Sequence, residues 1–171
     1  MIITLGSAVA GIARTRGKPE SRWESNLSIG YIRYTSIVSS GSAGQFQANR
    51  HLGIIKSISY YPLPSRLLSV GVSVDYIIED LAFSLNGALN LPLKRVIPFV
   101  SAGAGIALSG TTLLSYGTGI KLRLGGTLGL IAEFRHFRTR KDYGESSATK
   151  LVSGLVVRHS DFIGLGITYL Y

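Results

Sequence analysis

The feature that most constrains this sequence is a repeated alternation of large apolar residues with small or polar ones. Side chains of a β-strand point to opposite faces in turn, so a period of two residues indicates strands. The clearest example places Leu68, Val70, Val72, Val74 and Tyr76 on one face and Ser69, Gly71, Ser73 and Asp75 on the other. The same alternation recurs in residues 81–90, 100–108, 116–124, 128–135 and 162–171. The chain is therefore predicted to be all-β.

The number of strands depends on how the less regular segments are assigned. Four of these are also predicted to be strands, namely residues 2–14, 22–36, 45–61 and 150–158. Polar or proline-containing loops are predicted at residues 15–21, 38–44, 62–66, 92–95, 109–115 and 139–148. Counting every segment gives ten strands, whereas fusing residues 150–171 and leaving the N-terminal segment outside gives eight. The absence of a linker predicts one domain over residues 1–171.

The composition of the less apolar strand face separates a membrane barrel from a soluble one. A soluble lipocalin-like barrel, which would bind a ligand inside, should turn Lys, Glu, Asp and Thr towards water. Here that face consists mostly of Gly, Ala, Ser and Asn, and the chain has 21 glycines. Such small residues suit a narrow lumen, while Leu, Val and Ile point to lipid. Because an open sheet edge is costly in lipid, we predict a closed transmembrane antiparallel up-and-down β-barrel of 8–10 strands.

The second half of the chain carries a resemblance to a known group of proteins. The stretches VIPFVSAGAGIAL, YGTGIKLRLGGTLGLIAEFRHF and GLGITYLY, within residues 95–171, resemble small bacterial outer-membrane barrels of the OmpA, OmpX and OmpW type. The resemblance implies an outer-membrane location and recognition of the last strand by the barrel assembly machinery. Tyr169 and Tyr171 would occupy the aromatic positions of that assembly signal, where Phe is commoner. Because the N-terminus lacks the pattern of a secretory signal, we expect a mature form.

Charged residues on the inward face predict a network inside the barrel. These residues are Asp75, Lys121, Arg123, Glu133 and Arg135. Two interpretations are open: a salt-linked plug or the lining of a narrow pore. We favour the plug, because buried charges must be paired.

Basic residues also cluster in two predicted loops. Arg14, Arg16, Lys18 and Arg22 form one group, and Arg138, Arg140 and Lys141 form the other. If these loops face outward, lipopolysaccharide phosphates are candidate partners through charge-assisted hydrogen bonds, although solvated loops fit equally well. The net charge of +9 would also attract nucleic acid, but no aromatic and basic sheet motif supports that partner, and none is expected.

The sequence contains few residues of the types that act in catalysis or bind metal ions. There is no cysteine, and the three histidines, His51, His136 and His159, do not share metal-ligand spacing, so neither metal nor cofactor is expected. Barrel-borne lipid A deacylases have a serine two residues after a histidine on a late strand, whereas Arg138 follows His136 at that distance. His136 also falls on the lipid-facing phase, which favours an interfacial residue over a catalyst.

The sequence thus predicts an outer-membrane barrel without catalytic activity that has a structural or interaction role, such as that of a subunit of an envelope complex. A narrow channel and a lipid A-modifying enzyme are the alternatives within the membrane.

Overall fold

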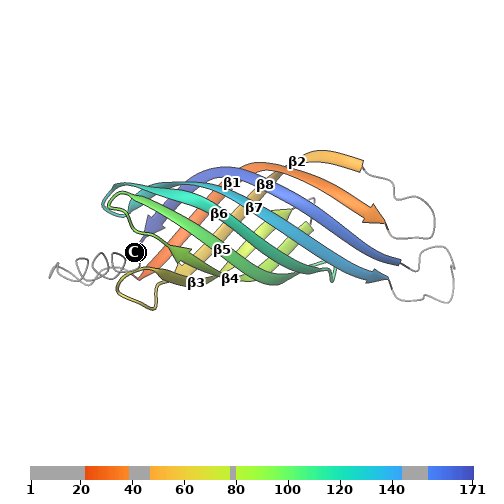
Figure 1. Cartoon of the computed structure of the whole chain (residues 1–171), viewed down its shortest axis with the longest axis horizontal. Helices are drawn as coiled ribbons and strands as arrows, with labels where there is room; N and C mark the ends of the chain where they lie inside the picture. The colour runs from red at the N-terminus through yellow and green to blue at the C-terminus, as the bar shows by residue number, and fades with distance from the viewer. Residues whose placement is uncertain (1–21, 39–46, 78–79, 144–153) are drawn as a thin grey trace, which may run out of the picture.

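A computed structural model describes residues 22–38, 47–77, 80–143 and 154–171. These residues form a closed barrel in which each strand pairs antiparallel with the next, and β1 pairs with β8 to close the ring (Figure 1). The strands are β1 (Trp23–Val38), β2 (Gln47–Tyr60), β3 (Leu68–Ile77), β4 (Asp80–Asn90), β5 (Val96–Ala107), β6 (Thr112–Gly125), β7 (Leu128–Tyr143) and β8 (Gly154–Leu170).

The all-β barrel is confirmed, with eight strands in the described residues rather than ten. Residues predicted as two strands, 150–158 and 162–171, belong to the single strand β8 from Gly154 onward. The predicted loop over residues 139–148 is wrong for its first part, since β7 continues to Tyr143. The strand predicted over residues 2–14 lies outside the described residues.

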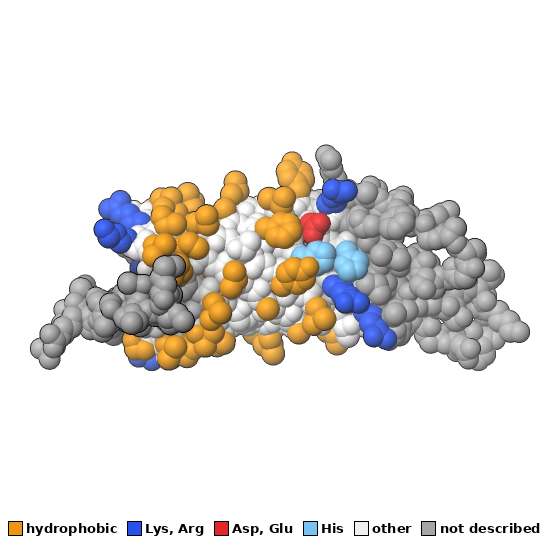
Figure 2. All heavy atoms as spheres, in the orientation of Figure 1, with side chains coloured by type: hydrophobic (Ala, Val, Ile, Leu, Met, Phe, Trp, Pro, Cys, Tyr) orange, Lys and Arg blue, Asp and Glu red, His pale blue; other side chains and the backbone are white. Residues whose placement is uncertain are grey.

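The side chains alternate in the sense that the sequence predicted. Along β3, Val72 is 53% exposed on the outer wall, while the neighbouring Ser73 is 2% exposed in the lumen. Apolar side chains are spread over much of the outer wall (Figure 2). This arrangement fits a wall that contacts lipid, and it is the reverse of a soluble lipocalin-like barrel, whose large apolar residues point inward.

Inward-facing glycines allow the strands to form a narrow barrel. A Cβ atom added to Gly30 in β1 would collide with the backbone of Ile163 in β8, and one added to Gly166 in β8 would collide with the backbone of Leu27 in β1. The seam between the first and last strands therefore requires residues without side chains.

The two ends of the barrel differ. The backbone of Trp23 is hydrogen-bonded to that of Tyr171, so both ends of the described chain meet at one end of the barrel, here named the near rim (Figure 1). The connections β2–β3, β4–β5 and β6–β7 lie at the same rim, and β6–β7 consists of a turn around Gly126, whose φ of 55° favours glycine. The opposite end, the far rim, holds the β5–β6 connection between Ala107 and Thr112. None of the described residues forms a helix that is long and apolar enough to cross a membrane.

Candidate functional site

The lumen next to the near rim is filled by one hydrogen-bonded group, here named the lysine cluster. It consists of Glu24, Asn26, Tyr61, Asn90 and Lys121, all of which are buried. The Nζ atom of Lys121 lies 2.5 Å from Oε1 of Glu24, and the Tyr61 hydroxyl donates to Oε2 of the same carboxylate over 2.6 Å. Asn26 donates its Nδ2 to Oε1 at 3.0 Å, and the Oδ1 atom of Asn90 accepts from Lys121 at 3.4 Å. The buried carboxylate and ammonium therefore satisfy each other.

Aromatic rings complete the surroundings of Lys121. Its ammonium lies 5.1 Å from the centre of the Phe99 ring and 5.9 Å from that of Tyr61, within the range of cation–π attraction. Tyr61 lies just beyond the end of β2, where burial and the Glu24 carboxylate raise the pKa of its phenol. The hydroxyl thus stays protonated and acts as a donor to Glu24.

Two further polar groups lie deeper in the lumen. The Nε atom of Arg135 pairs with Oε2 of Glu133 at 2.7 Å. On the β3–β4 wall, Asp75 accepts hydrogen bonds from Ser73 and Ser84, each at 3.1 Å. Both groups are buried, and the opposite charges of Glu133 and Arg135 compensate each other.

An apolar cluster closes the lumen towards the far rim, and we name it the apolar plug. Phe137 and Phe162 are fully buried, and Phe137 follows Glu133 and Arg135 along β7 in the direction of the far rim. The members of the plug are Ile32, Ile55, Ile77, Ala82, Ala107, Leu113, Phe137 and Phe162. The lysine cluster occupies the other end, since Lys121 pairs with Ile131, earlier on β7.

One small cavity is described between these layers. A cavity of about 30 Å³ lies beside Asn26, Lys121 and Arg135, which is room for a water molecule or two. Side chains of the lysine cluster, the Glu133–Arg135 pair and the apolar plug thus occupy successive levels of the described lumen.

The structure places the predicted lumen residues in different hydrogen-bonded groups, although Arg135 and Glu133 lie close enough to Asp75 to interact with it electrostatically. Arg135 pairs with Glu133, Asp75 is held by serines, and Lys121 pairs with Glu24, which sequence reasoning did not identify. Arg123 lies half-buried close to the near rim, two residues beyond Lys121. Glu24, Asn26, Tyr61 and Asn90 were missed. Glu24, Asn26 and Ser28 are alternate residues on the inward face, and this pattern could have identified them. The alternation is irregular at the start of the predicted strand 22–36, which obscured the pattern.

A second polar group lies on the outer wall across strands β7 and β8. The Nδ1 atom of His136 is 2.7 Å from Oδ1 of Asp161, and its Nε2 atom is 3.2 Å from Nδ1 of His159. The Tyr116 ring packs against the His136 ring with centres 4.9 Å apart. Figure 2 shows histidine and acidic side chains next to each other on this face of the barrel, between apolar and basic side chains.

The placement of His136 on the outer wall agrees with its predicted phase. Its partners were missed, because His159 and Asp161 become neighbours of His136 only through the β7–β8 register. No serine is hydrogen-bonded to this group among the described residues, and the same part of the chain holds no cluster of three His, Cys, Asp or Glu side chains that could bind a metal ion.

The comparisons with known proteins agree with this architecture. The sequence matches no family model and no curated protein. Among solved structures, Neisserial surface protein A matches with a TM-score of 0.62 at 13% identity, over 90% of this chain and 100% of that one. The outer membrane protein AlkL matches with a TM-score of 0.54 at 13% identity, over 93% and 94% of the two chains.

A third structure is the outer membrane protease OmpT from Escherichia coli, with a TM-score of 0.50 at 9% identity, over 92% of this chain and 99% of that one. At such identities the likeness concerns the fold. The fold is that of a small outer-membrane β-barrel. The predicted resemblance is confirmed at this level.

In a barrel of this type, the two predicted basic groups are separated. Arg22 lies at the near rim, where its Nη1 atom donates to the Tyr60 hydroxyl at 3.4 Å. Arg138 and Arg140 are exposed on the outer wall of β7 towards the far rim, in a strand and not in the predicted loop. Lys141 also belongs to β7, while Arg14, Arg16 and Lys18 lie outside the described residues. Arg22 and Arg138 therefore lie towards opposite ends of the barrel.

The predicted C-terminal aromatic residues are at the near rim. Tyr169 and Tyr171 are about half exposed, and their ring centres are 5.3 Å apart. Trp23 and Tyr60 form a similar pair at 5.0 Å at the same rim. Aromatic rings at this level are typical of the boundary between lipid tails and headgroups. Their role as an assembly signal stays a prediction.

Proposed function

We propose that this chain is an integral protein of the bacterial outer membrane that acts as a closed, non-catalytic barrel with a structural or interaction role. The observation that carries the proposal is the pair of side-chain clusters inside the lumen, with the lysine cluster at the near-rim end and the apolar plug towards the far rim. A barrel closed in this way offers its outer wall and its rims to other molecules. Lipopolysaccharide, the assembly machinery and other envelope proteins are its proposed partners.

The location follows from the outer wall and the chain ends. Exposed apolar side chains suit hydrocarbon, and an even number of strands brings both ends of the described chain to one rim. In outer-membrane barrels the rim with short turns faces the periplasm, so the near rim is proposed to be periplasmic and the far rim extracellular.

Planar-bilayer recordings test the closed lumen. The pure protein, shown to be folded by migration on a detergent gel that changes on boiling, should give no conductance above background. Stable ion conductance of the wild-type protein would contradict the proposal and support the narrow-channel alternative.

One observation favours an enzyme as a second candidate. The Asp161 carboxylate orients the His136 imidazole as the acid of a hydrolytic triad would, and one of the matching folds, OmpT, is a protease by name. Against it, Arg138 stands where lipid A deacylases have serine, and His159 occupies the Nε2 side of His136. Mass spectrometry of lipid A after incubation with the pure protein should show no change in mass. A loss of acyl chains that His136→Ala abolishes would favour the enzyme.

A further inference from the structure

Basic side chains gather at the near rim, and we name them the basic collar. They come from the residue before β1, the β2–β3 connection, the β4–β5 turn and the end of β6, so they are distributed around the barrel. Figure 2 shows basic side chains at this end of the barrel, on the left of the view. Arg66 and Arg123 are half-buried and have contacts of their own. The other members, Arg22, Lys94 and Arg95, are exposed.

The acidic side chains that the structure describes do not balance this charge at the surface of the near rim. Glu24 lies at that end, but it is buried and pairs with Lys121. The others lie in the lumen, on the outer wall of β8 or at the far rim, and are Asp75, Glu133, Asp161 and Asp80. The described part of the near rim is therefore a region of positive potential, which attracts anions.

Two exposed cations of the collar form the tip of the β4–β5 turn. The backbones of Leu93 and Val96 exchange two hydrogen bonds, each of 2.9 Å, so the chain reverses direction over Lys94 and Arg95. Consecutive residues at the tip of a tight turn place two positive charges close together. The turn can therefore bind one anionic group with both side chains.

The backbone conformation at two collar positions suits glycine better than a basic residue. Among the described residues other than glycine, positive φ angles occur at Arg66, with 55°, and at Lys94, with 53°. The β6–β7 turn at the same rim has Gly126 in this conformation, with a φ of 55°. A residue with a side chain is less favourable there than glycine. The two cations thus occupy the near rim against a local backbone preference, which points to a role for their charge.

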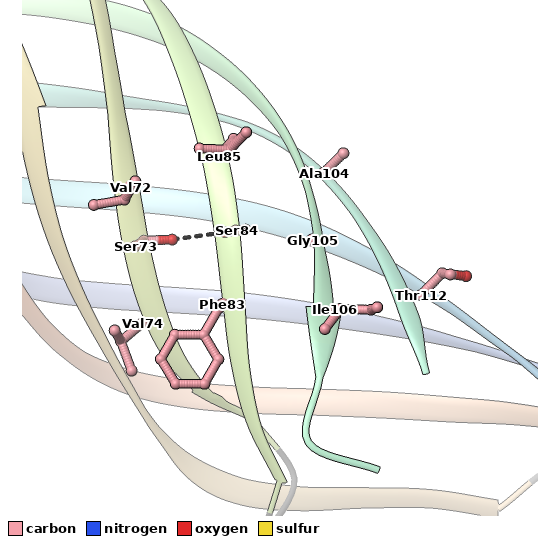
Figure 3. A pocket seen from close by; sticks show the side chains of 10 residues that line it. All are labelled: Val72, Ser73, Val74, Phe83, Ser84, Leu85, Ala104, Gly105, Ile106 and Thr112. Carbon is pink, nitrogen blue, oxygen red and sulfur yellow. Dashed lines mark hydrogen bonds between the residues drawn. The ribbon is translucent and has the colours of Figure 1, made fainter. Parts of the chain in front are cut away.

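Apolar side chains reach the turn itself. Leu91 and Leu93, each 54% exposed, directly precede the two cations. Farther along the wall, Val72, Phe83 and Leu85 continue the exposed apolar surface towards the far rim (Figure 3). Cations that adjoin such a surface lie at the level where lipid headgroups meet hydrocarbon. The arrangement therefore fits an anionic lipid better than a soluble anionic polymer.

We infer that the basic collar binds anionic phospholipid, with the β4–β5 turn as its principal contact. The lipid phosphate accepts hydrogen bonds from Lys94 and Arg95, and the acyl chains lie against Leu91 and Leu93. The choice of phospholipid rests on the proposed function, because the near rim is proposed to face the periplasm, where the adjoining leaflet of the outer membrane consists of phospholipid. The site adds a specific partner to that function.

Lipid retention measured by native mass spectrometry tests the site. The protein is folded into phosphatidylcholine vesicles that contain a small share of phosphatidylglycerol, and is then released into detergent. Lys94→Gly removes one cation at a position whose φ suits glycine, and adding Arg95→Gln removes the second. Arg33→Gln is the matched control, because Arg33 is exposed on the outer wall of β1, ten residues along the strand from Trp23 at the near rim.

The wild-type protein should retain phosphatidylglycerol in preference to phosphatidylcholine, and added salt should reduce this preference. Lys94→Gly should lower the retention of phosphatidylglycerol about fivefold and the double variant about 25-fold, as expected for the loss of one and two cations near an anionic surface. Urea unfolding should show Lys94→Gly to be at least as stable as the wild type, so a damaged fold would not explain its loss of lipid. Arg33→Gln should retain phosphatidylglycerol like the wild type.

Three results would overturn the inference: equal retention of the two lipids by the wild type, unchanged retention in the double variant, or an equal loss in Arg33→Gln. Binding of peptidoglycan fragments that depends on Lys94 and Arg95, without a change in lipid retention, would also overturn it. Each result would come from a folded, inserted barrel. A chain that does not insert into vesicles at all would instead contradict the proposed function, so the two failures are distinguishable.

Discussion

The Nζ atom of Lys121 on β6 lies 2.5 Å from Oε1 of Glu24 on β1, so one ion pair joins two strands that are not neighbours in the barrel. Both side chains are at most 5% exposed. The pair connects opposite parts of the wall inside the lumen and fixes the width of the near-rim end. A buried pair of this kind is costly to break, because one uncompensated charge remains.

Removing one member of this pair should destabilise the barrel more than removing both. We expect Lys121→Met or Glu24→Gln alone to lower the free energy of unfolding by about 3–5 kcal/mol, because the remaining charge is buried without a counter-charge. The double variant should lose less than either single variant. Urea unfolding in detergent, followed by tryptophan fluorescence of Trp23, measures all four proteins. Additive losses would show that the two groups do not depend on each other.

The two closures of the lumen should act in series. Lys121→Ser with Glu24→Ser widens the near-rim end only, and Phe137→Ala with Phe162→Ala widens the far-rim end only. Neither pair of changes should produce conductance in planar bilayers, while all four together should. Each Phe→Ala change costs about 3–5 kcal/mol, so conductance is read only from preparations that keep folded migration on a gel. Conductance after opening one end alone would mean that a single layer closes the barrel.

The outer-wall histidines should hold a defined tautomer. An ionised Asp161 can only accept a hydrogen bond, so Nδ1 of neutral His136 carries the proton, and its Nε2 atom accepts from Nδ1–H of His159. Nitrogen-15 NMR at a pH where both rings are neutral should show this form, and Asp161→Asn should change the His136 signals. Asp80→Asn, at another far-rim acid that binds Ser109, is the control and should leave them unchanged. Unaltered His136 signals in Asp161→Asn would contradict the assignment.

The outward and inward faces could be predicted from the sequence because lipid and lumen impose opposite demands on alternate residues. Val72 contacts hydrocarbon and Ser73 has to fit a narrow interior, so the alternation can be recognised in the amino-acid sequence. The ends of β7 and β8 were harder to assign. Near Tyr143 and Gly154 the alternation fades into polar residues, which removes the signal for a strand.

The partners of the lumen charges could not be predicted. Their positions in the alternation identify Lys121 and Glu133 as lumen residues. Which carboxylate meets which cation depends on the position of each residue along the barrel axis, because the strands are tilted. The position along the axis is set by the register of every strand pair around the barrel. The same holds for His136 and Asp161, which are 25 residues apart in sequence and adjacent only through the β7–β8 pairing.

The seam between β1 and β8 should tolerate no added methyl group at its close contacts. Gly166→Ala would place a Cβ atom against the backbone of Leu27, and backbone cannot move aside as a flexible side chain can. We expect a loss of roughly 1–3 kcal/mol in unfolding free energy, the usual cost of overpacking. A smaller share of the unboiled protein should also migrate as the folded band on a detergent gel.

The matched control is Gly87→Ala, where the nearest atom to the new Cβ is the Ser69 carbonyl oxygen at 4.0 Å. That variant should unfold within about 0.5 kcal/mol of the wild type. Equal behaviour of the two variants would mean that the β1–β8 seam can widen, and that its glycines are not needed for closure.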